Sequence, residues 1–240
     1  MKKEQYKCGE INPISIDDLC KNIKDNLMLL QNYVRLDSSI SVLNIGCGQG
    51  HESIALQKIL NCNVIVIDKN KVVEKFSGIH EKIRLLKDDI YSINFNNKFN
   101  LIYCYHVLEH VNDPALLLKK TGNLLSQNGV AFFGFPNKNR IVGYLNPSPT
   151  QKVSLKTKIL WNLNDYKHRL TGKFENKYGA HAGFTEKEFN DLAESYFKVI
   201  NVTNLYYDKK YDRNKYYNIL KFFGVFKFLK PSLYFILKKK

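Results

Sequence analysis

Three glycines at alternate positions form the most distinctive short motif of the chain. Gly46, Gly48 and Gly50 follow the apolar run 42–45 and precede a segment of helical character. Such a turn leaves free backbone N–H groups at a helix start, and glycines let a ligand lie against the main chain. The dinucleotide motif G-x-G-x-x-G would place its third glycine at position 51, which is His51. The sequence therefore predicts a tighter G-x-G-x-G binding loop, here called the glycine loop (residues 46–50).

An acidic residue ends the next apolar run. Asp68 follows residues 64–67 and comes about 20 residues after the glycines. A carboxylate at the tip of the second strand is placed to accept hydrogen bonds from both hydroxyls of a ribose. The sequence thus predicts a nucleoside-containing ligand between the glycine loop and Asp68.

Ionisable residues cluster directly after the apolar run 99–104. His106 and His110 are four residues apart, and Glu109 lies three residues after His106. One helical turn would therefore present the two histidines together. Imidazole and carboxylate groups at a strand tip can take a proton from a hydroxyl. They can also hold a divalent metal that lowers the pKa of the hydroxyl.

Apolar runs alternate with amphipathic segments along much of the chain. This alternation predicts a parallel sheet covered on both faces, with the ligand at the carboxyl ends of the strands. Pro114 and Thr185 mark two helix starts. We predict strands near 40–45, 63–67, 82–86, 99–104, 129–135 and 197–203, and helices near 16–34, 51–60, 70–77, 113–125 and 185–196.

Taken in chain order, these motifs resemble the class I S-adenosylmethionine-dependent methyltransferases. The segment Leu108-Glu109-His110-Val111 resembles the L-E-H-V motif of the branch that includes ubiquinone-pathway and sugar or glycan O-methyltransferases. The resemblance covers residues 40–136 closely and 178–205 more loosely. It implies a Rossmann-like, doubly wound α/β fold, with a mostly parallel seven-stranded sheet and an antiparallel last strand. We assign that strand to 232–238 and expect the final lysines to leave the sheet.

The resemblance also implies how S-adenosylmethionine is held. The glycine loop would lie beneath its methionine part, Asp68 would bind its ribose, and Asp89 and the backbone of Ile90 would bind its adenine. Asn44 departs from the family, which usually has Asp or Glu there, so one negative charge near the sulfonium is lost. The cofactor-binding residues implied in this way are Asn44, Gly46, Cys47, Gly48, Gly50, Asp68, Lys69, Asp89, Ile90 and Cys104.

Three interpretations of the catalytic residues remain open. In the first, His106 or His181 is a general base. His181 is included because in related enzymes the segment after the insertion returns to the active-site mouth. In the second, His106, Glu109, His110 and His181 hold a divalent metal, as the E-x-x-E-H cluster of some relatives does. Here that cluster reads H-x-x-E-H, since His106 replaces its first acid. In the third, Glu109 and His110 only tie the strand tip to its helix.

One methyltransferase domain, residues 1–240, accommodates the whole sequence. We divide it into an N-terminal helical segment (1–39), a cofactor-binding core (40–136), a basic insertion (137–180) and a C-terminal part (181–240). The insertion is too long for an ordinary loop, and 155–163 has the character of a helix. We therefore expect it to form a lid over the acceptor.

Positive charge is concentrated in this lid. The formal net charge is +15, and residues 138–177 contain nine lysines and arginines against only Asp165 and Glu175. Such a field favours acidic partners. We therefore expect Lys167, Arg169 and Lys173 to bind an anionic acceptor. An RNA methyltransferase is the alternative that the net charge suggests, but no RNA-binding module is appended.

Residues 214–230 mix aromatic side chains with lysines. The pattern is too interrupted for a membrane span and predicts a basic amphipathic helix. Three partners remain open for it: a membrane surface, the chain's own body, or a second copy in a homodimer.

The sequence as a whole predicts a methyltransferase that methylates oxygen on a small anionic or lipid-linked acceptor, such as a sugar or glycan precursor. The alternative outside the enzymes is a non-catalytic cofactor-binding or scaffold subunit. Asn44 is the only residue that favours this alternative. The polar N-terminus predicts no secretion, and five scattered cysteines without C-x-x-C pairs predict free thiols. We therefore expect a cytoplasmic protein that is peripheral to the membrane at most.

Overall fold

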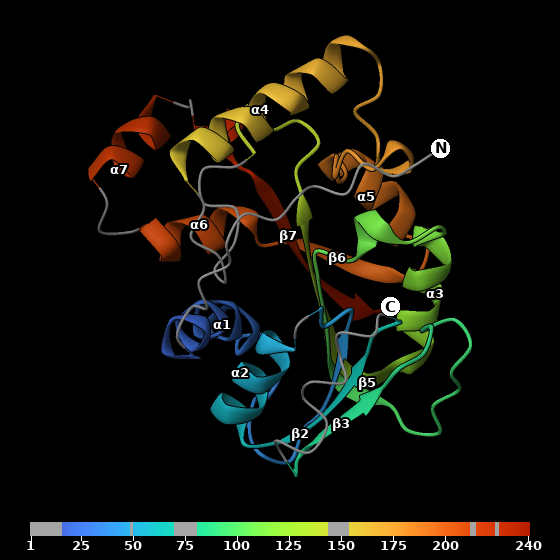
Figure 1. Ribbon diagram of the computed structural model, residues 1–240. Helices are drawn as coiled ribbons and strands as arrows, with labels where there is room; N and C mark the ends of the chain where they lie inside the picture. The colour runs from blue at the N-terminus through green and yellow to red at the C-terminus, as the bar shows by residue number, and fades with distance from the viewer. Residues whose placement is uncertain (1–15, 49, 70–80, 144–153, 212–214, 224–225) are drawn as a thin grey trace.

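The computed structural model describes residues 16–48, 50–69, 81–143, 154–211, 215–223 and 226–240. Its centre is a seven-stranded sheet of order β3-β2-β1-β4-β5-β7-β6, in which only β7 runs antiparallel to its neighbours (Figure 1). The predicted doubly wound α/β fold is thereby confirmed. The strands are β1 (Ser41–Ile45), β2 (Asn63–Ile67), β3 (Ile83–Leu86), β4 (Phe99–Tyr105), β5 (Leu125–Pro136), β6 (Phe197–Asn201) and β7 (Ser232–Lys239).

Helices cover both faces of this sheet (Figure 1). Helices α1, α2 and α6 pack on one face, and α3 and α5 pack on the other. The helices are α1 (Ile16–Leu30), α2 (His51–Leu60), α3 (Pro114–Leu124), α4 (Leu155–Leu170), α5 (Glu186–Ala193), α6 (Thr203–Tyr211), α7 (Lys215–Phe222) and α8 (Phe226–Leu229), with the 3₁₀ turns η2 (Leu108–His110) and η3 (Asn176–Tyr178). No helix of the described residues is long and apolar enough to span a bilayer.

Alternating side chains of the central strands supply the two hydrophobic cores. On β5, Phe132 points into the core beneath α1 and α2, whereas Phe133 points into the core beneath α3 and α5. Because successive side chains leave a strand on opposite faces, a strand buried on both sides reads as one continuous apolar run. The burial of both phenylalanines explains why the run 130–135 carries no polar residue.

Two helix starts follow the predicted signals. The Asp113 side chain accepts a hydrogen bond from Leu116 N (2.9 Å), with Pro114 in the first turn. Thr185 and Glu188 form a reciprocal capping box, in which Thr185 N donates to Glu188 Oε2 (2.7 Å). Such caps satisfy N–H groups that a helix start leaves without partners.

Several boundaries differ from the sequence prediction. Strand β5 begins at Leu125 and not near 129, and β6 ends at Asn201, so that Thr203 begins the unpredicted helix α6. The single helix expected over 214–230 is divided into α7 and α8. Lys238 pairs with Val130, so the expectation that the final lysines leave the sheet is wrong. The helix predicted near 70–77 lies outside the described residues.

The two ends of the insertion meet at a narrow neck. Asn137 and Phe184 form a parallel β-bridge, and Phe184 N donates to Pro136 O (3.1 Å). Gly183 has φ +76°, and a Cβ there would lie 1.7 Å from Pro136 O. Only glycine fits this approach of two backbones. The insertion therefore leaves and rejoins the sheet at one point.

Candidate active site

The glycine loop has the conformation that its three glycines predict. Gly46, Gly48 and Gly50 have φ values of +71°, +52° and +79°, in the left-handed region that glycine adopts freely. A Cβ on Gly46 would lie 2.3 Å from Cγ2 of Val107, whereas a Cβ on Gly48 would meet no atom of the described residues within 4 Å. Gly46 is thus required for packing, whereas Gly48 leaves room beside its backbone among the described residues.

Asp68 lies against this loop. Its Oδ2 accepts a hydrogen bond from Gly48 N (2.9 Å), and the residue is buried at the carboxyl end of β2. Parallel strands β1 and β2 bring the two residues together although they are 20 positions apart. The structure therefore brings together the two residues predicted to border a ribose, and ribose binding by Asp68 remains a prediction.

The residues predicted to hold the adenine lie after β3. Asp89 is half-buried, and its Oδ1 accepts from Tyr91 N (3.1 Å); Ile90 is buried beside it. Lys69 is exposed. These residues occupy the same carboxyl edge of the sheet as Asp68, since β2 pairs with β3.

Cys47 and Cys104 are both buried within the cofactor region. Burial first, and then the charge of Asp68, raise the pKa of Cys47 to about 12. Both thiols are therefore protonated near neutral pH and can contribute packing but not nucleophilic attack. The cysteines in the described part of the chain are all free.

Asn44 is fully buried on β1. Its Nδ2 donates to Ser53 Oγ (2.8 Å), which joins the strand to α2. Its Oδ1 has no hydrogen-bond partner among the described residues. An unsatisfied buried acceptor costs about 1–3 kcal/mol. The amide thus keeps one structural bond and leaves one polar atom that a bound ligand or water can satisfy.

His106 and Glu109 form a hydrogen-bonded pair at the end of β4. His106 Nδ1 lies 3.1 Å from Glu109 Oε1, and Glu109 is buried. Burial by itself would raise the pKa of Glu109, but the hydrogen bond and charge of His106 hold it below its ordinary value. If Nδ1 carries the proton of this bond, Nε2 is the basic nitrogen.

The backbone of His106 is strained. Its φ is +53°, and its N–H donates to Gly134 O (2.7 Å). A non-glycine residue in this region costs about 1–3 kcal/mol and often marks a functional site. The next residue, Val107, packs over Gly46. The His106–Glu109 pair therefore lies immediately beside the glycine loop.

His110 and His181 form a second, separate pair. Their ring centroids lie 4.6 Å apart in an edge-to-face arrangement. The pKa of His181 is lowered, first by burial and then by the charge of His110. The 3₁₀ turn η2 begins at Leu108 and excludes His106, so the expected helical turn with both histidines together is not formed. Within the described residues, no three His, Cys, Asp or Glu side chains are grouped so as to hold a metal ion.

Glu52 belongs to the site although the sequence did not single it out. Burial raises the pKa of its carboxyl to about 7, and the charge of His106 opposes that shift. The same carboxylate raises the pKa of Tyr103 and Tyr105 on β4, after the larger effect of burial. An acid in a first helical turn ordinarily complements the helix dipole at the surface. Only the position of Glu52 directly after the glycine loop could have indicated that its side chain is buried near the site.

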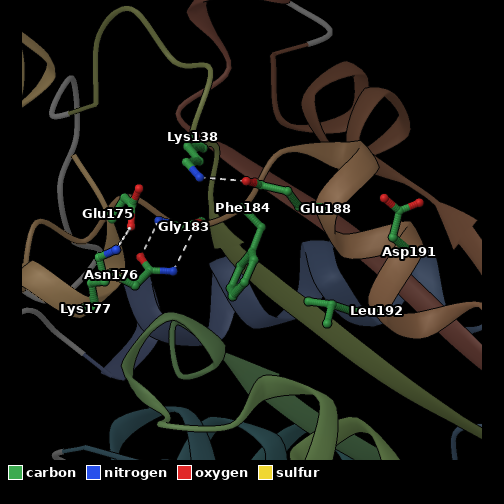
Figure 2. A pocket seen from close by; sticks show the side chains of 9 residues that line it. All are labelled: Lys138, Glu175, Asn176, Lys177, Gly183, Phe184, Glu188, Asp191 and Leu192. Carbon is green, nitrogen blue, oxygen red and sulfur yellow. Dashed lines mark hydrogen bonds and ion pairs between the residues drawn. The ribbon is translucent and has the colours of Figure 1, made fainter. Parts of the chain in front are cut away.

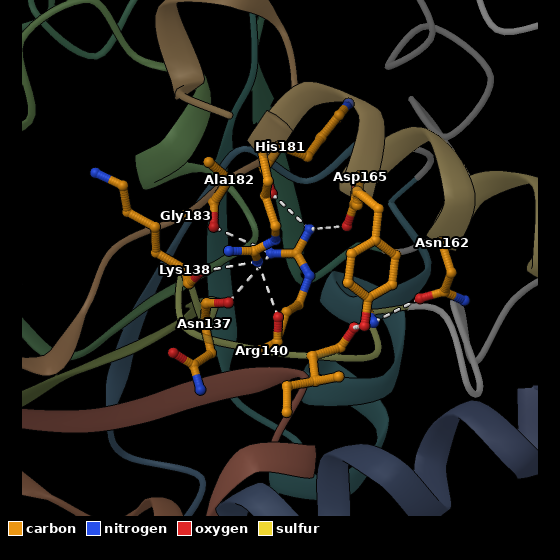
Figure 3. Close-up of polar contacts among 12 residues, drawn as sticks. Asn137, Lys138, Arg140, Asn162, Asp165, His181, Ala182 and Gly183 are labelled. Carbon is orange, nitrogen blue, oxygen red and sulfur yellow. Dashed lines mark hydrogen bonds and ion pairs between the residues drawn. The ribbon is translucent and has the colours of Figure 1, made fainter. Parts of the chain in front are cut away.

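Two arginines hold the segments of the insertion together: Arg140, which is buried (Figure 3), and Arg169, which is half-buried. Arg140 Nη2 contacts Asp165 Oδ2 of α4 (2.8 Å), and Nη1 donates to Ala182 O (3.0 Å). Arg169 donates to the carbonyls of Lys138 and Arg140 and lies 3.8 Å from the Phe174 ring centre.

The three cations predicted to bind the acceptor therefore differ in their contacts. The Arg169 guanidinium is engaged with backbone carbonyls of the insertion itself, whereas Lys167 and Lys173 are exposed.

A pocket of about 460 Å³ lies between η3 and α5 (Figure 2). Two ion pairs border it, Lys138–Glu188 (2.6 Å) and Lys177–Glu175 (2.9 Å), and Phe184 forms part of its wall. None of the residues predicted to bind the cofactor lines it. The pocket is therefore distinct from the cradle of the glycine loop and Asp68.

The sheet order, the glycine loop and the acidic residues at the carboxyl strand ends define a Rossmann-like protein that binds a nucleoside-containing cofactor. The chain belongs to the methyltransferase domain family, which it matches over residues 17–196. It is a methyltransferase, and its methyl donor is S-adenosylmethionine. The open space at Gly48 and the unsatisfied Oδ1 of Asn44 fit that donor.

Curated relatives carry a more specific name. A ubiquinone biosynthesis O-methyltransferase of Psychrobacter arcticus is 25% identical over 210 residues, which are 80% of each chain. One from Pelagibacter ubique is 31% identical over 132 residues, 53% of this chain. The chain spans 54% of the length of the Pelagibacter protein.

Solved structures share the fold. The plantazolicin methyltransferase BpumL, in complex with a desmethyl analogue and SAH, aligns with a TM-score of 0.59 over 94% of this chain and 83% of its own, at 16% identity. The N-methyltransferase NodS from Bradyrhizobium japonicum aligns with a TM-score of 0.52 over 94% and 99% of the two chains, at 13% identity.

Proposed function

We propose that the protein methylates a hydroxyl oxygen on a small anionic or lipid-linked acceptor, such as a sugar or glycan precursor. The observation that carries the proposal is the position of the His106–Glu109 pair, whose following residue Val107 packs over Gly46 of the glycine loop. A proton acceptor beside the methyl donor is what an oxygen nucleophile needs. The O-methyltransferase name of the relatives supports oxygen over nitrogen.

Bound S-adenosylmethionine supplies the activated methyl group. The glycine loop, Asp68, Asp89 and the backbone of Ile90 bind and orient that donor. Catalysis then rests on alignment and on removal of the acceptor proton. His106 Nε2 takes the proton from the hydroxyl, while buried Glu109 keeps the ring oriented and stabilises the imidazolium that forms.

The nature of the acceptor follows from the insertion and the second histidine pair. Lys167 and Lys173 are exposed and supply positive charge for a phosphate or carboxylate, and Arg169 adds to the same field from its fixed position. His110 and His181 lie where the chain returns from the insertion toward η2. We infer that residues 137–180 act as a lid and that this histidine pair borders the acceptor.

Part of the C-terminal segment is consistent with a lipid-linked acceptor, because some of its aromatic side chains are exposed. Tyr217 of α7 is buried in the chain's own core, whereas Phe222 and Phe223 are 85% and 71% exposed. One side of 214–230 therefore packs on the body, and aromatic side chains remain for a membrane or partner.

The acceptor class is tested with a panel of hydroxyl compounds, each offered with and without a phosphate or carboxylate, by measuring release of S-adenosylhomocysteine. We expect the anionic member of each pair to react faster. His106→Ala should lower turnover about 10²–10⁴-fold, the usual contribution of a general base. Its affinity for S-adenosylhomocysteine in calorimetry should stay unchanged.

Two outcomes contradict the proposed base. Full activity of His106→Ala on a good acceptor removes His106 from catalysis. Loss of turnover in EDTA, with recovery on adding Mg²⁺ or Mn²⁺, would replace the base by a metal.

A further inference from the structure

Helix α4 turns its polar face toward the protein. Asp165 is buried in its ion pair with Arg140, and Asn162 Oδ1 accepts from Gly143 N (2.8 Å). Arg169, one turn after Asp165, donates to two backbone carbonyls of the segment that leaves β5. The contacts that hold α4 in place therefore include an ion pair and several hydrogen bonds from its polar side.

The opposite face of α4 is apolar and exposed. Leu155 and Leu170, at the two ends of the helix, are 74% and 89% exposed. Between them, Ile159 and Leu163 continue the row on the same side of the helix, and Leu160 lies beside it. Tyr166 is also partly exposed, but its hydroxyl donates to Ile141 O (2.9 Å), which ties it to the segment after β5. The exposed apolar set, here called the α4 stripe, consists of Leu155, Ile159, Leu160, Leu163 and Leu170.

This orientation is the reverse of an ordinary surface helix, whose apolar side meets the core. The helix has 16 residues, which corresponds to about 24 Å of length. A continuous exposed apolar row of that length marks an interaction surface. In Figure 1, α4 lies along the outer edge of the molecule, away from the sheet.

The charges on the exposed side of α4 are all positive. Lys156 and Lys167 are exposed beside the α4 stripe, and the only acid of the helix, Asp165, is turned inward. Anionic lipid headgroups complement this arrangement, because a helix that lies in the membrane interface buries apolar side chains and keeps lysines at headgroup level.

A second copy of the chain fits less well, because two such helices packed against each other would bring their lysines together. We propose that α4 is a membrane-contact helix that lies in the plane of an anionic bilayer surface. The inference goes beyond methyl transfer and does not depend on it, since lipid binding is measured without turnover.

Vesicle flotation of the full-length protein tests the inference. The vesicles contain phosphatidylcholine alone or with phosphatidylglycerol, and no acceptor is added. We expect the wild-type protein to float with the anionic vesicles and to be released by high salt. Leu163→Gln with Leu170→Gln should lower the partition coefficient by about tenfold or more, since each leucine loses its apolar burial.

Lys156→Glu with Lys167→Glu should lower partition to anionic vesicles about tenfold. The matched control is Leu116→Gln with Lys119→Glu on α3, where both residues are exposed but α4 is not altered. This control should float like the wild-type protein. S-adenosylhomocysteine binding by each variant shows that its core is folded.

Three results overturn the inference. One is a folded wild-type protein that remains unbound to every vesicle. Another is loss of flotation only when Phe222 and Phe223 are replaced, which assigns the contact to α7. The last is a dimer that the α4 variants dissociate, which assigns the stripe to a second copy. Failure of the proposed O-methylation changes none of these readouts.

Discussion

The cofactor-binding core, residues 40–136, and the insertion, residues 137–180, follow opposite rules of polarity. In the core, phenylalanines such as Phe132 and Phe133 point inward, and polar groups gather at the strand ends. In the insertion, Arg140 and Asp165 are buried, while Leu155 and Leu170 face outward. The comparison shows that apolar periodicity locates a helix but does not say which of its faces meets the protein.

The buried ion pair of the insertion gives the largest expected effect on stability. Arg140→Ala leaves Asp165 buried without its partner, which should cost about 3–5 kcal/mol of the stability that holds α4. Urea unfolding and limited proteolysis within 137–180 measure it. S-adenosylhomocysteine affinity should stay within about twofold, because its binding groups lie on earlier strands.

Two further variants sharpen this test. Arg140→Met with Asp165→Leu removes both charges and should recover much of the stability. Lys138→Ala breaks only the partly exposed ion pair with Glu188 and should cost at most about 1 kcal/mol. A parallel collapse of cofactor affinity in Arg140→Ala would mean that core and insertion are not independent.

Two substitutions in the glycine loop should have different effects, one mainly on folding stability and the other mainly on cofactor binding. Gly46→Ala places a Cβ against Val107 in a left-handed backbone and should cost about 2–4 kcal/mol of folding stability. Gly48→Ala meets no protein atom, so only the backbone strain of about 1–2 kcal/mol remains, but cofactor affinity should fall.

Gly172→Ala is the control for this pair. Gly172 has φ +66° and open space around its Cβ, but it lies in the insertion. It should therefore show the strain cost alone. Equal cofactor affinities for Gly48→Ala and Gly172→Ala would disprove the role of the loop.

A pH-dependent effect on stability is expected for Glu52. Its pKa in the folded protein is about 7 against an ordinary 4.5, so the folded form retains a proton that the unfolded form loses between these values. Stability therefore falls as the pH rises through that window. Glu52→Gln removes the free-energy cost of ionising this buried carboxyl. The variant should therefore be about 1–2 kcal/mol more stable than the wild type at pH 8. Urea unfolding should show no difference near pH 4.5; an equal gain at both pH values would contradict burial of the carboxyl.

The sequence was sufficient for the sheet and for the proximity of the glycine loop to Asp68. Gly48 and Asp68 belong to consecutive strands, and parallel neighbours bring their carboxyl ends to one edge. The contacts among the candidate catalytic residues were harder to predict, because His106 has a left-handed backbone that leaves it outside η2. It therefore pairs with Glu109, while His110 pairs with His181 from a distant segment.

The orientation of α4 was also beyond the sequence. Asp165 of α4 pairs with Arg140, which lies 25 residues earlier, and no local sequence pattern shows that this pair is buried. The inward direction of Glu52 depends likewise on tertiary packing around α2. In both places long-range contacts reverse the environment that local composition suggests.

The neck between Asn137 and Phe184 has a consequence for how such enzymes diverge. Because the insertion begins and ends at one bridge, its content can change without moving either strand that it joins. The entropic cost of a closed loop grows slowly, by about 0.6 kcal/mol for each doubling of its length. Segments of quite different size can therefore be exchanged at this point, and a new acceptor preference can arise while the methyl-donor site is inherited intact.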